Sequence, residues 1–290
     1  KQRRRIYAAL LCSSMVLSLV SMPVSAAETG QLTNPPTSTE GPGSPESASG
    51  NEAAAVLNGL YAALPVANGV KEVATADELT DALADSSISI ITLKDDVEIS
   101  STLTVNRTVT LDLNGNVLKM TGSDSVIKVE ADGDLTIQDR NTTTQHTFNP
   151  HCKYQFWYID MWELDKDGSE IVSGGVITAG GSIVGCSARS RGGGVYLGKD
   201  SDTGKSGTFI MTSGSIIGCA AQLGGGVYVT SGCTFVMATS SNIHNCIANN
   251  DGGGVINHGT FQMRGGTIST CTTVAFGGGG VCNNGTFIMS

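Results

Sequence analysis

Two groups of residues in this chain could take part in chemistry: carboxylates and a cluster of aromatic side chains. A glycoside hydrolase needs two opposed carboxylates, and a metal-dependent lyase needs several around its calcium together with a base. Between residues 171 and 290 there are five bases but only three acids, which are Asp200, Asp202 and Asp251. Any catalytic carboxylates would therefore have to come from the acidic N-terminal part, for example Asp112, Asp139 and Asp165.

The aromatic cluster lies in residues 141–170, which contain both tryptophans of the chain. Its candidate ligand-binding residues are Tyr154, Phe156, Trp157, Tyr158 and Trp162. Two interpretations stay open. The rings form a platform for sugar rings or for a partner protein, or they pack back onto the rest of the domain and cover exposed strands.

Other chemical motifs are missing from the sequence. It holds no nucleophile elbow, Walker loop or His-Glu-x-x-His motif, and its cysteines form no Cys-x-x-Cys pair of the kind that zinc sites use. Four cysteines instead follow matching Ile-x-x-Cys elements, namely Cys186, Cys219, Cys246 and Cys271. We interpret them as small buried hydrophobic residues, and we predict no catalytic residue, no metal and no cofactor.

A repeat organises the C-terminal part of the chain and must position these residues. Phenylalanine recurs every 26 residues, at Phe209, Phe235, Phe261 and Phe287, and a methionine follows each one two places later. The motif Gly-Gly-Gly-Val recurs as well, beginning at Gly192, Gly224, Gly252 and Gly278. Such a short period with several apolar pieces is typical of one coil of a solenoid.

The coils are predicted to be β-strands. Glycines occur too often for helices, while pieces such as Val227–Val229 and Thr234–Met237 alternate apolar and polar residues as strands do. We predict three strands per coil, corners at the glycine triplets, and parallel stacking about 4.8 Å apart that places identical side chains above one another. The interior would then hold a column of Val, a column of Phe and Met, and a column of Ile.

Export is predicted from the N-terminus. Residues 1–26 combine four basic residues, an apolar run and the small residues Val24-Ser25-Ala26, as a secretory signal peptide does. Its removal takes four of the 17 Lys and Arg residues and no acid, which leaves 13 bases against 26 acids and a net charge of −13. We therefore expect a secreted or cell-surface protein without a membrane span after cleavage, and no nucleic-acid partner.

The remaining chain divides into a linker and one domain. Residues 27–69 are rich in Pro, Ser and Gly and are predicted to be a disordered linker with a short helix within it. Residues 70–290 form the predicted β domain, whose residues 70–84 cap its open end with a helix that starts at Thr75. Less regular coils follow over 88–137, and 141–170 is an aromatic insertion between coils.

The repeats resemble a known family. Leu111-Asp112-Leu113-Asn114-Gly115, Gly174-Gly175-Val176-Ile177-Thr178 and the recurring Gly-Thr-Phe-x-Met are similar to secreted right-handed parallel β-helix proteins of Gram-positive gut bacteria, described as adhesin-like or pectate-lyase-like. The resemblance covers residues 70–290 and implies a right-handed parallel β-helix solenoid. The Asn-Thr-Asp, Gly-Asp-Asp and Arg-Ile-Lys signatures of the β-helix polygalacturonases do not occur.

Three hypotheses of function follow from the sequence. The leading one is a non-catalytic surface protein that binds a glycan, a host surface protein or a cell-wall partner through its lateral face or its aromatic insertion. The alternatives are a polysaccharide lyase or glycoside hydrolase of the pectin-degrading type, and a purely structural spacer. The chain stops midway through a coil, so further coils and a cell-wall attachment segment are expected beyond residue 290.

Overall fold

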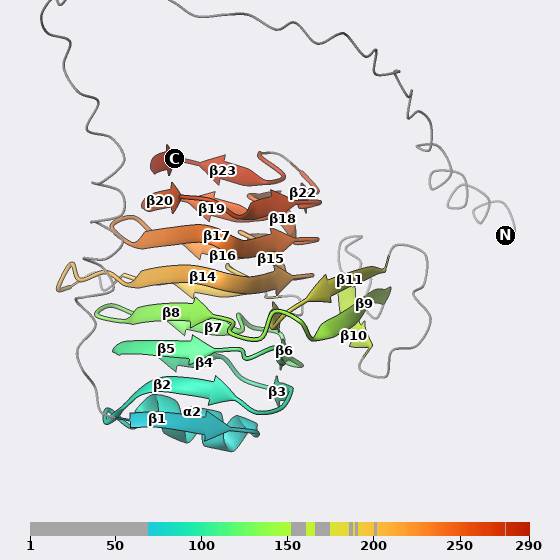
Figure 1. The fold of residues 1–290 in the computed structure, drawn as a ribbon. Coiled ribbons are helices and arrows are strands. Elements are labelled where there is room, and N and C mark those ends of the chain that lie inside the picture. Colours follow the sequence, from blue (N-terminus) through green and yellow to red (C-terminus); the bar gives the residue numbers. More distant parts are fainter. Residues whose placement is uncertain are drawn as a thin grey trace, which may run out of the picture. The chain divides into compact units, whose positions relative to one another are not determined.

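The computed structural model describes residues 69–151, 161–165, 175–185, 188, 191–199, 202–275 and 277–290. The predicted signal peptide and linker, residues 1–26 and 27–69, lie outside this part except for Gly69. The described residues form a stack of parallel coils, each made of short strands that pair with the coil before and the coil after (Figure 1). In the described part of the chain, no helix is both long and apolar enough to span a membrane.

The elements of the first three coils are short. A strand, β1 (Gly69–Val73), precedes the helix α2 (Ala76–Ala84). The first coil is β2 (Ile88–Leu93), β3 (Val97–Ile99) and β4 (Leu103–Val105). The second is β5 (Thr108–Asp112), β6 (Val117–Met120) and β7 (Ile127–Val129). The third is β8 (Asp134–Gln138), β12 (Ser182–Val184) and β13 (Val195–Leu197).

The later coils contain longer strands. The fourth consists of β14 (Thr208–Ile217), β15 (Ala220–Leu223) and β16 (Val227–Val229). The fifth consists of β17 (Thr234–His244), β18 (Ile247–Asp251) and β19 (Val255–Asn257). The sixth holds β20 (Thr260–Met263), β21 (Thr267–Ser269), β22 (Thr272–Thr273) and β23 (Val281–Asn283), and β24 (Thr286–Met289) follows.

The 26-residue period places identical side chains on top of one another, as predicted. Phe209 pairs with Phe235 and Phe235 with Phe261, and their rings stack with centroids 4.9 and 4.8 Å apart. Phe287 continues the column at 5.0 Å. The first three phenylalanines are fully buried, so each contributes its whole side chain to the core.

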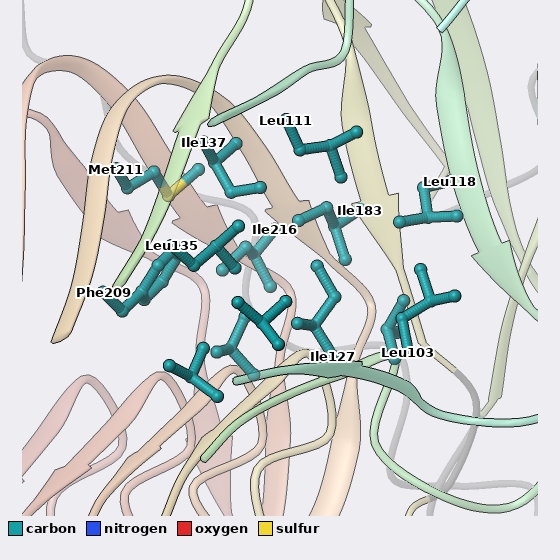
Figure 2. Packing of buried hydrophobic residues seen from close by; sticks show 14 of the residues in the cluster. Leu103, Leu111, Leu118, Ile127, Leu135, Ile137, Ile183, Phe209, Met211 and Ile216 are labelled. Carbon is teal, nitrogen blue, oxygen red and sulfur yellow. The ribbon is translucent and has the colours of Figure 1, made fainter. Parts of the chain in front are cut away.

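Aliphatic residues continue these columns into the less regular coils. Leu135 pairs with Phe209 in register and Ile137 pairs with Met211, and Figure 2 shows the members of each pair next to each other. Ile183 and Ile216 pair in the second column, and Val195, Val227 and Val255 pair in the third. The predicted columns of Phe and Met, Ile, and Val are thereby confirmed, and the fold is a parallel β-helix.

The strands of a coil are divided differently from the prediction. In the fourth and fifth coils the stretch before the cysteine is one long strand, β14 or β17, and a short strand follows the cysteine. These short strands and their counterpart in the sixth coil, β15, β18 and β22, pair in parallel as a separate sheet. This segment is stacked like the others, so its backbone groups must pair with the neighbouring coils. Its residues differ from coil to coil, Ala-Ala-Gln-Leu against Ile-Ala-Asn-Asn, which is why no repeat revealed it.

The glycine triplets form corners, as the sequence predicts. The first glycine has a positive φ in three of them, for example +65° at Gly224. At the second glycine the coils touch: a Cβ on Gly225 would lie 2.4 Å from the Gly253 carbonyl oxygen and 2.5 Å from that of Ile247. One glycine thus permits the turn and the next permits the close approach of the coils.

The three described cysteines of the column, Cys219, Cys246 and Cys271, have free thiols. Cys219 and Cys246 are inaccessible to solvent, and Cys271 at the last rung is half-buried. The Cys246 thiol donates to the carbonyl oxygen of Ile216 at 3.8 Å, and burial raises its pKa well above the ordinary value. The thiolate is therefore scarce, which fits the interpretation of these residues as small apolar ones. Cys186 lies outside the described residues.

The helix α2 covers the end of the stack. Thr75 is its N-cap and accepts from the Glu78 backbone N–H at 3.3 Å, while the Glu78 carboxylate accepts from the Ala74 N–H at 2.8 Å. Leu79, Ala82 and Leu83 face the core and are buried. The helix contacts β1, β2, β3 and β4, so it closes the apolar interior at the first coil.

A small separate sheet leaves the stack between β8 and β12. It consists of β9 (Gln145–His151), β10 (Met161–Asp165) and β11 (Val176–Ala179), which pair antiparallel in the order β10-β9-β11. Figure 1 shows this sheet beside the coils rather than within them. Most of the proposed aromatic insertion, residues 141–170, belongs to this segment or lies outside the described residues.

Candidate functional site

The predicted aromatic site falls largely outside the described residues. This applies to Tyr154, Phe156, Trp157 and Tyr158. Trp162 lies in β10, opposite Pro150 of β9. The platform of aromatic rings on the insertion therefore stays a prediction.

One aromatic residue of the insertion packs against the wall of the β-helix. Phe148 in β9 is fully buried and forms an apolar cluster with Val117, Val184 and Ile217. These three residues come from β6, β12 and β14, and Val184 pairs with Ile217. The second interpretation, that the aromatics cover exposed strands, therefore holds for Phe148.

The candidate carboxylate Asp112 is buried and forms an ion pair with the exposed side chain of Arg140. Its side chain is inaccessible to solvent and pairs with the guanidinium of Arg140, whose Nη2 also donates to Thr92 at 3.3 Å. Asp112 also accepts from the backbone N–H of Asn114 at 3.0 Å and from the Gln138 side chain at 3.1 Å. These donors occupy its oxygens, so Asp112 joins a corner of the second coil to the third coil.

Asp139 is a second buried carboxylate with a structural role. Its Oδ1 accepts from the Gly115 N–H at 2.7 Å and its Oδ2 from the Gly181 N–H at 2.8 Å. Ser213 in the next coil accepts from the Asp139 backbone N–H at 2.6 Å. Asp165 of β10 is opposite Thr147 in another sheet. Within the described ranges, no three His, Cys, Asp or Glu side chains gather to hold a metal ion.

The structure instead brings a different set of residues together on the lateral face of the sheet β4-β7-β13-β16. Thr104, Lys128, Tyr196 and Tyr228 are the central residues of these strands and lie in register. Their neighbours in each strand, for example Val195 and Leu197, fill the core. Because side chains alternate along a strand, these central residues must point outward and form a ladder along the stack.

A hollow of about 480 Å³ lies on this face, and we call it the lateral cleft. Its hydroxyl-bearing residues are Thr102, Thr104, Ser125 and Tyr196. Its charged residues are Asp124, Lys128 and Arg191, and Ala188 completes the lining. Residues from three successive coils therefore meet at one site, with one aromatic ring, several hydroxyls and charges of both signs.

The backbone and side chains around the lateral cleft are held in place. The Ser125 hydroxyl donates to the Arg191 carbonyl oxygen at 2.9 Å, and the Thr102 hydroxyl donates to the Ser125 carbonyl oxygen at 2.7 Å. The Lys128 ammonium pairs with Glu130 at 2.8 Å. Arg191 forms no ion pair within the part of the chain that the structure describes, so its guanidinium can donate to a ligand.

Tyr196 has a second tyrosine ring beside it on the neighbouring strand. Tyr228 lies 5.5 Å from it and is almost fully buried, with Arg191 5.1 Å over its ring and His258 5.5 Å away. Burial raises the pKa of Tyr228, so its hydroxyl stays protonated. This layered arrangement limits the motion of Tyr196, which is the ring that lines the cleft.

The sequence contains a signal for this ladder that the prediction of site residues missed. Tyr196 and Tyr228 each follow a Gly-Gly-Gly-Val motif directly, so the repeat itself places both tyrosines on one face. The concentration of aromatic residues in 141–170 pointed to the insertion instead. His258, which directly follows β19, contacts the ring of Tyr228.

Parallel coils, matched columns and a helical cap define a solenoid of the parallel β-helix class. Residues 70–183 match the family model of the pectate lyase-like adhesive domain. No curated protein and no solved structure matches the chain. The match agrees with the resemblance stated from the sequence, and the fold is that of a parallel β-helix. The matched range includes α2 and the first two coils, whereas Tyr196 and Arg191 of the cleft follow it.

Proposed function

We propose that this protein is a non-catalytic, secreted or surface-exposed adhesive protein that binds a glycan in the lateral cleft. The observation that carries the proposal is the composition of the cleft: Tyr196 next to Arg191, with three aliphatic hydroxyls around them. An aromatic ring attracts the C–H groups of a sugar face through its negative π-surface, and Arg and hydroxyl groups hydrogen-bond to sugar oxygens.

The secondary structure favours a glycan over an extended peptide at this face. Peptides that add to a sheet need unpaired backbone groups at a strand edge. The strands β4, β7, β13 and β16 pair with one another along the stack, so their lateral face offers side chains only. Recognition here depends on hydroxyl, guanidinium and aromatic groups, which suit a ligand covered with hydroxyls.

The roles of Asp112 and Asp139 support binding rather than cleavage. Both carboxylates are buried and hydrogen-bonded within the coils. Asp124 lines the cleft, and Glu130 forms an ion pair with Lys128. The family match to an adhesive domain supports the same conclusion.

The experiment is a glycan array probed with the full chain, followed by affinity measurements on the variants Tyr196→Ala and Arg191→Ala. We expect each change to weaken binding about tenfold or more, since each removes one main contact of a hydrogen-bonded sugar. Lys71→Ala in β1, exposed and outside the cleft, is the matched control and should bind like the parent chain.

A double variant of the insertion, Trp157→Ala with Trp162→Ala, separates the two candidate sites. Loss of binding in this variant, with no effect of Tyr196→Ala, would transfer the site to the insertion. Absence of any glycan binding would contradict the proposal and favour a structural spacer. Release of unsaturated or reducing ends from a bound polysaccharide would instead support the enzymatic alternative.

A further inference from the structure

The strand β1 is the outermost strand at the capped end of the stack (Figure 1). Among the described strands it pairs only with β2, so its other edge stays open. An open edge presents unpaired backbone groups, and another strand or a second copy of the same chain can add to it. The residues of β1 therefore decide whether two molecules can join at their capped ends.

The backbone groups on the open edge belong to Val70 and Glu72. The Val73 carbonyl oxygen accepts from the Lys94 N–H at 2.8 Å, which directs the backbone groups of Val73 toward β2. Because backbone groups alternate along a strand, those of Lys71 also face β2, whereas those of Val70 and Glu72 face away from it. In the described part of the chain, the N–H and C=O groups of these two residues are thus left for a partner strand.

One register uses all of these groups when two copies meet. A strand that pairs with its own copy about a two-fold axis runs antiparallel to it. If Lys71 lies on the axis, Val70 of each molecule pairs with Glu72 of the other, and all their backbone groups are bonded. A shift one way would need the Ala74 N–H, which already donates to the Glu78 carboxylate at 2.8 Å. A shift the other way carries Glu72 past the start of β1, so the register centred on Lys71 fits best.

Lys71 opposes pairing in this register. Its side chain would lie directly opposite the same side chain of the second copy, with the two Cα atoms about 4.5 Å apart. Like charges at directly opposed positions destabilise a strand pair. The equivalent positions of the next coils are apolar: Lys71 pairs in register with Ile91, and Leu111 and Ile137 follow. These three residues are buried, whereas Lys71 is exposed.

From these observations we propose that Lys71 blocks self-association of the protein at its capped end. A charged residue on the core side of an edge strand keeps two such edges from pairing. The helix α2 contacts the first strands and covers the apolar interior, and Lys71 protects the backbone edge that the helix leaves open. This block acts at the capped end and does not depend on ligand binding in the lateral cleft.

The substitution Lys71→Val tests the block by sedimentation equilibrium of the full chain. We expect the parent chain to keep the mass of a monomer, and Lys71→Val to dimerise with a Kd at least about tenfold lower than that of the parent chain. Lys94→Val removes an exposed lysine that is not on the open edge, so it is the matched control and should stay monomeric. Circular dichroism shows whether each variant is folded. A folded Lys71→Val chain that stays monomeric would overturn the proposal.

A mixture of variants separates the effect of charge from that of an added apolar side chain. Lys71→Glu alone still opposes like charges and should stay monomeric. Equal amounts of the parent chain and Lys71→Glu place opposite charges face to face, so we expect a mixed dimer that salt weakens. If Lys71→Val dimerises but this mixture does not, the charge of Lys71 is not the block and the proposal fails.

Hydrogen exchange and a proline locate the contact. In the Lys71→Val dimer, the N–H groups of Val70 and Glu72 should exchange more slowly than in the monomer. Adding Glu72→Pro removes one of these N–H groups, which is tolerated at a strand edge, and should abolish the dimer. Dimers that survive Glu72→Pro form elsewhere, an outcome that overturns the block and leaves the proposed glycan binding standing.

Discussion

At the scale of single residues, two acids that the sequence offered as candidate catalytic carboxylates have structural contacts within the coils. Asp112 and Asp139 come from turn-like sequences, where carboxylates are usually solvated. In the structure both are buried, and each is satisfied by donors from a different coil. They join neighbouring coils at corners where the strand ladders are interrupted.

The substitution Asp139→Ala tests this role. It leaves the Gly115 and Gly181 N–H groups buried without an acceptor, so we expect the free energy of unfolding to fall by about 3 kcal/mol. Urea unfolding followed by circular dichroism measures the change. Asp134→Ala, at an exposed position five residues earlier, should change stability by less than about 0.5 kcal/mol. Equal effects of the two substitutions would contradict the structural role of Asp139.

At the scale of elements, the cap and the first coils depend on one side chain. The Arg107 guanidinium donates from Nη2 to the Ala82 carbonyl and from Nε to the Leu83 carbonyl, both at 2.9 Å. Its Nη1 donates to the Ile88 carbonyl at 2.6 Å. Arg107 thus satisfies carbonyl groups at the C-terminal end of α2 and ties the helix to the start of β2.

The substitution Arg107→Lys should loosen this cap although it keeps the charge. A single ammonium cannot reach three carbonyls that the planar guanidinium reaches together, so we expect a loss of about 2 kcal/mol. Hydrogen exchange should rise first in α2 and β2, while β16 and β17 stay protected. If exchange in α2 is unchanged, the cap is held by Leu79 and its apolar neighbours alone.

At the scale of the whole stack, stability depends on contacts between neighbouring coils. Each phenylalanine between two others has both ring faces covered, as Phe235 does between Phe209 and Phe261. In the part of the chain that the structure describes, Phe287 stacks on Phe261 and is half-buried. In such a linear array, the loss of one side chain destabilises the protein through the contacts that the side chain makes with the coils on either side.

Two substitutions of the same type compare these positions. Phe235→Ala should lower the free energy of unfolding by about 4 kcal/mol, the usual cost for a fully buried phenylalanine. Phe287→Ala should cost less than half as much, because less surface is lost. Calorimetric melting of both variants measures the difference, and equal costs would show that the coils do not act as nearest neighbours.

The features that could be predicted from the sequence are those that belong to the repeat or to a local motif. The step from Phe209 to Phe287 was visible because identical residues occupy identical positions, and the capping motif at Thr75 uses only local sequence. The contacts of Arg107 and Asp139 join residues of different coils that share no repeated motif, so nothing in the sequence pairs them. The cleft was missed for another reason: Arg191 and Asp124 are 67 positions apart and meet only because a long insertion separates two adjacent coils.

The outward ladder allows single surface residues to change without disturbing the coils. Thr104, Lys128, Tyr196 and Tyr228 are contributed one per coil, and their strands are held by backbone bonds and by the residues on either side. Replacing one of them alters the chemistry at a single level and leaves the scaffold beneath it intact. If the proposed binding at this face is right, its ligand preference can therefore change by one residue at a time without a change in the fold.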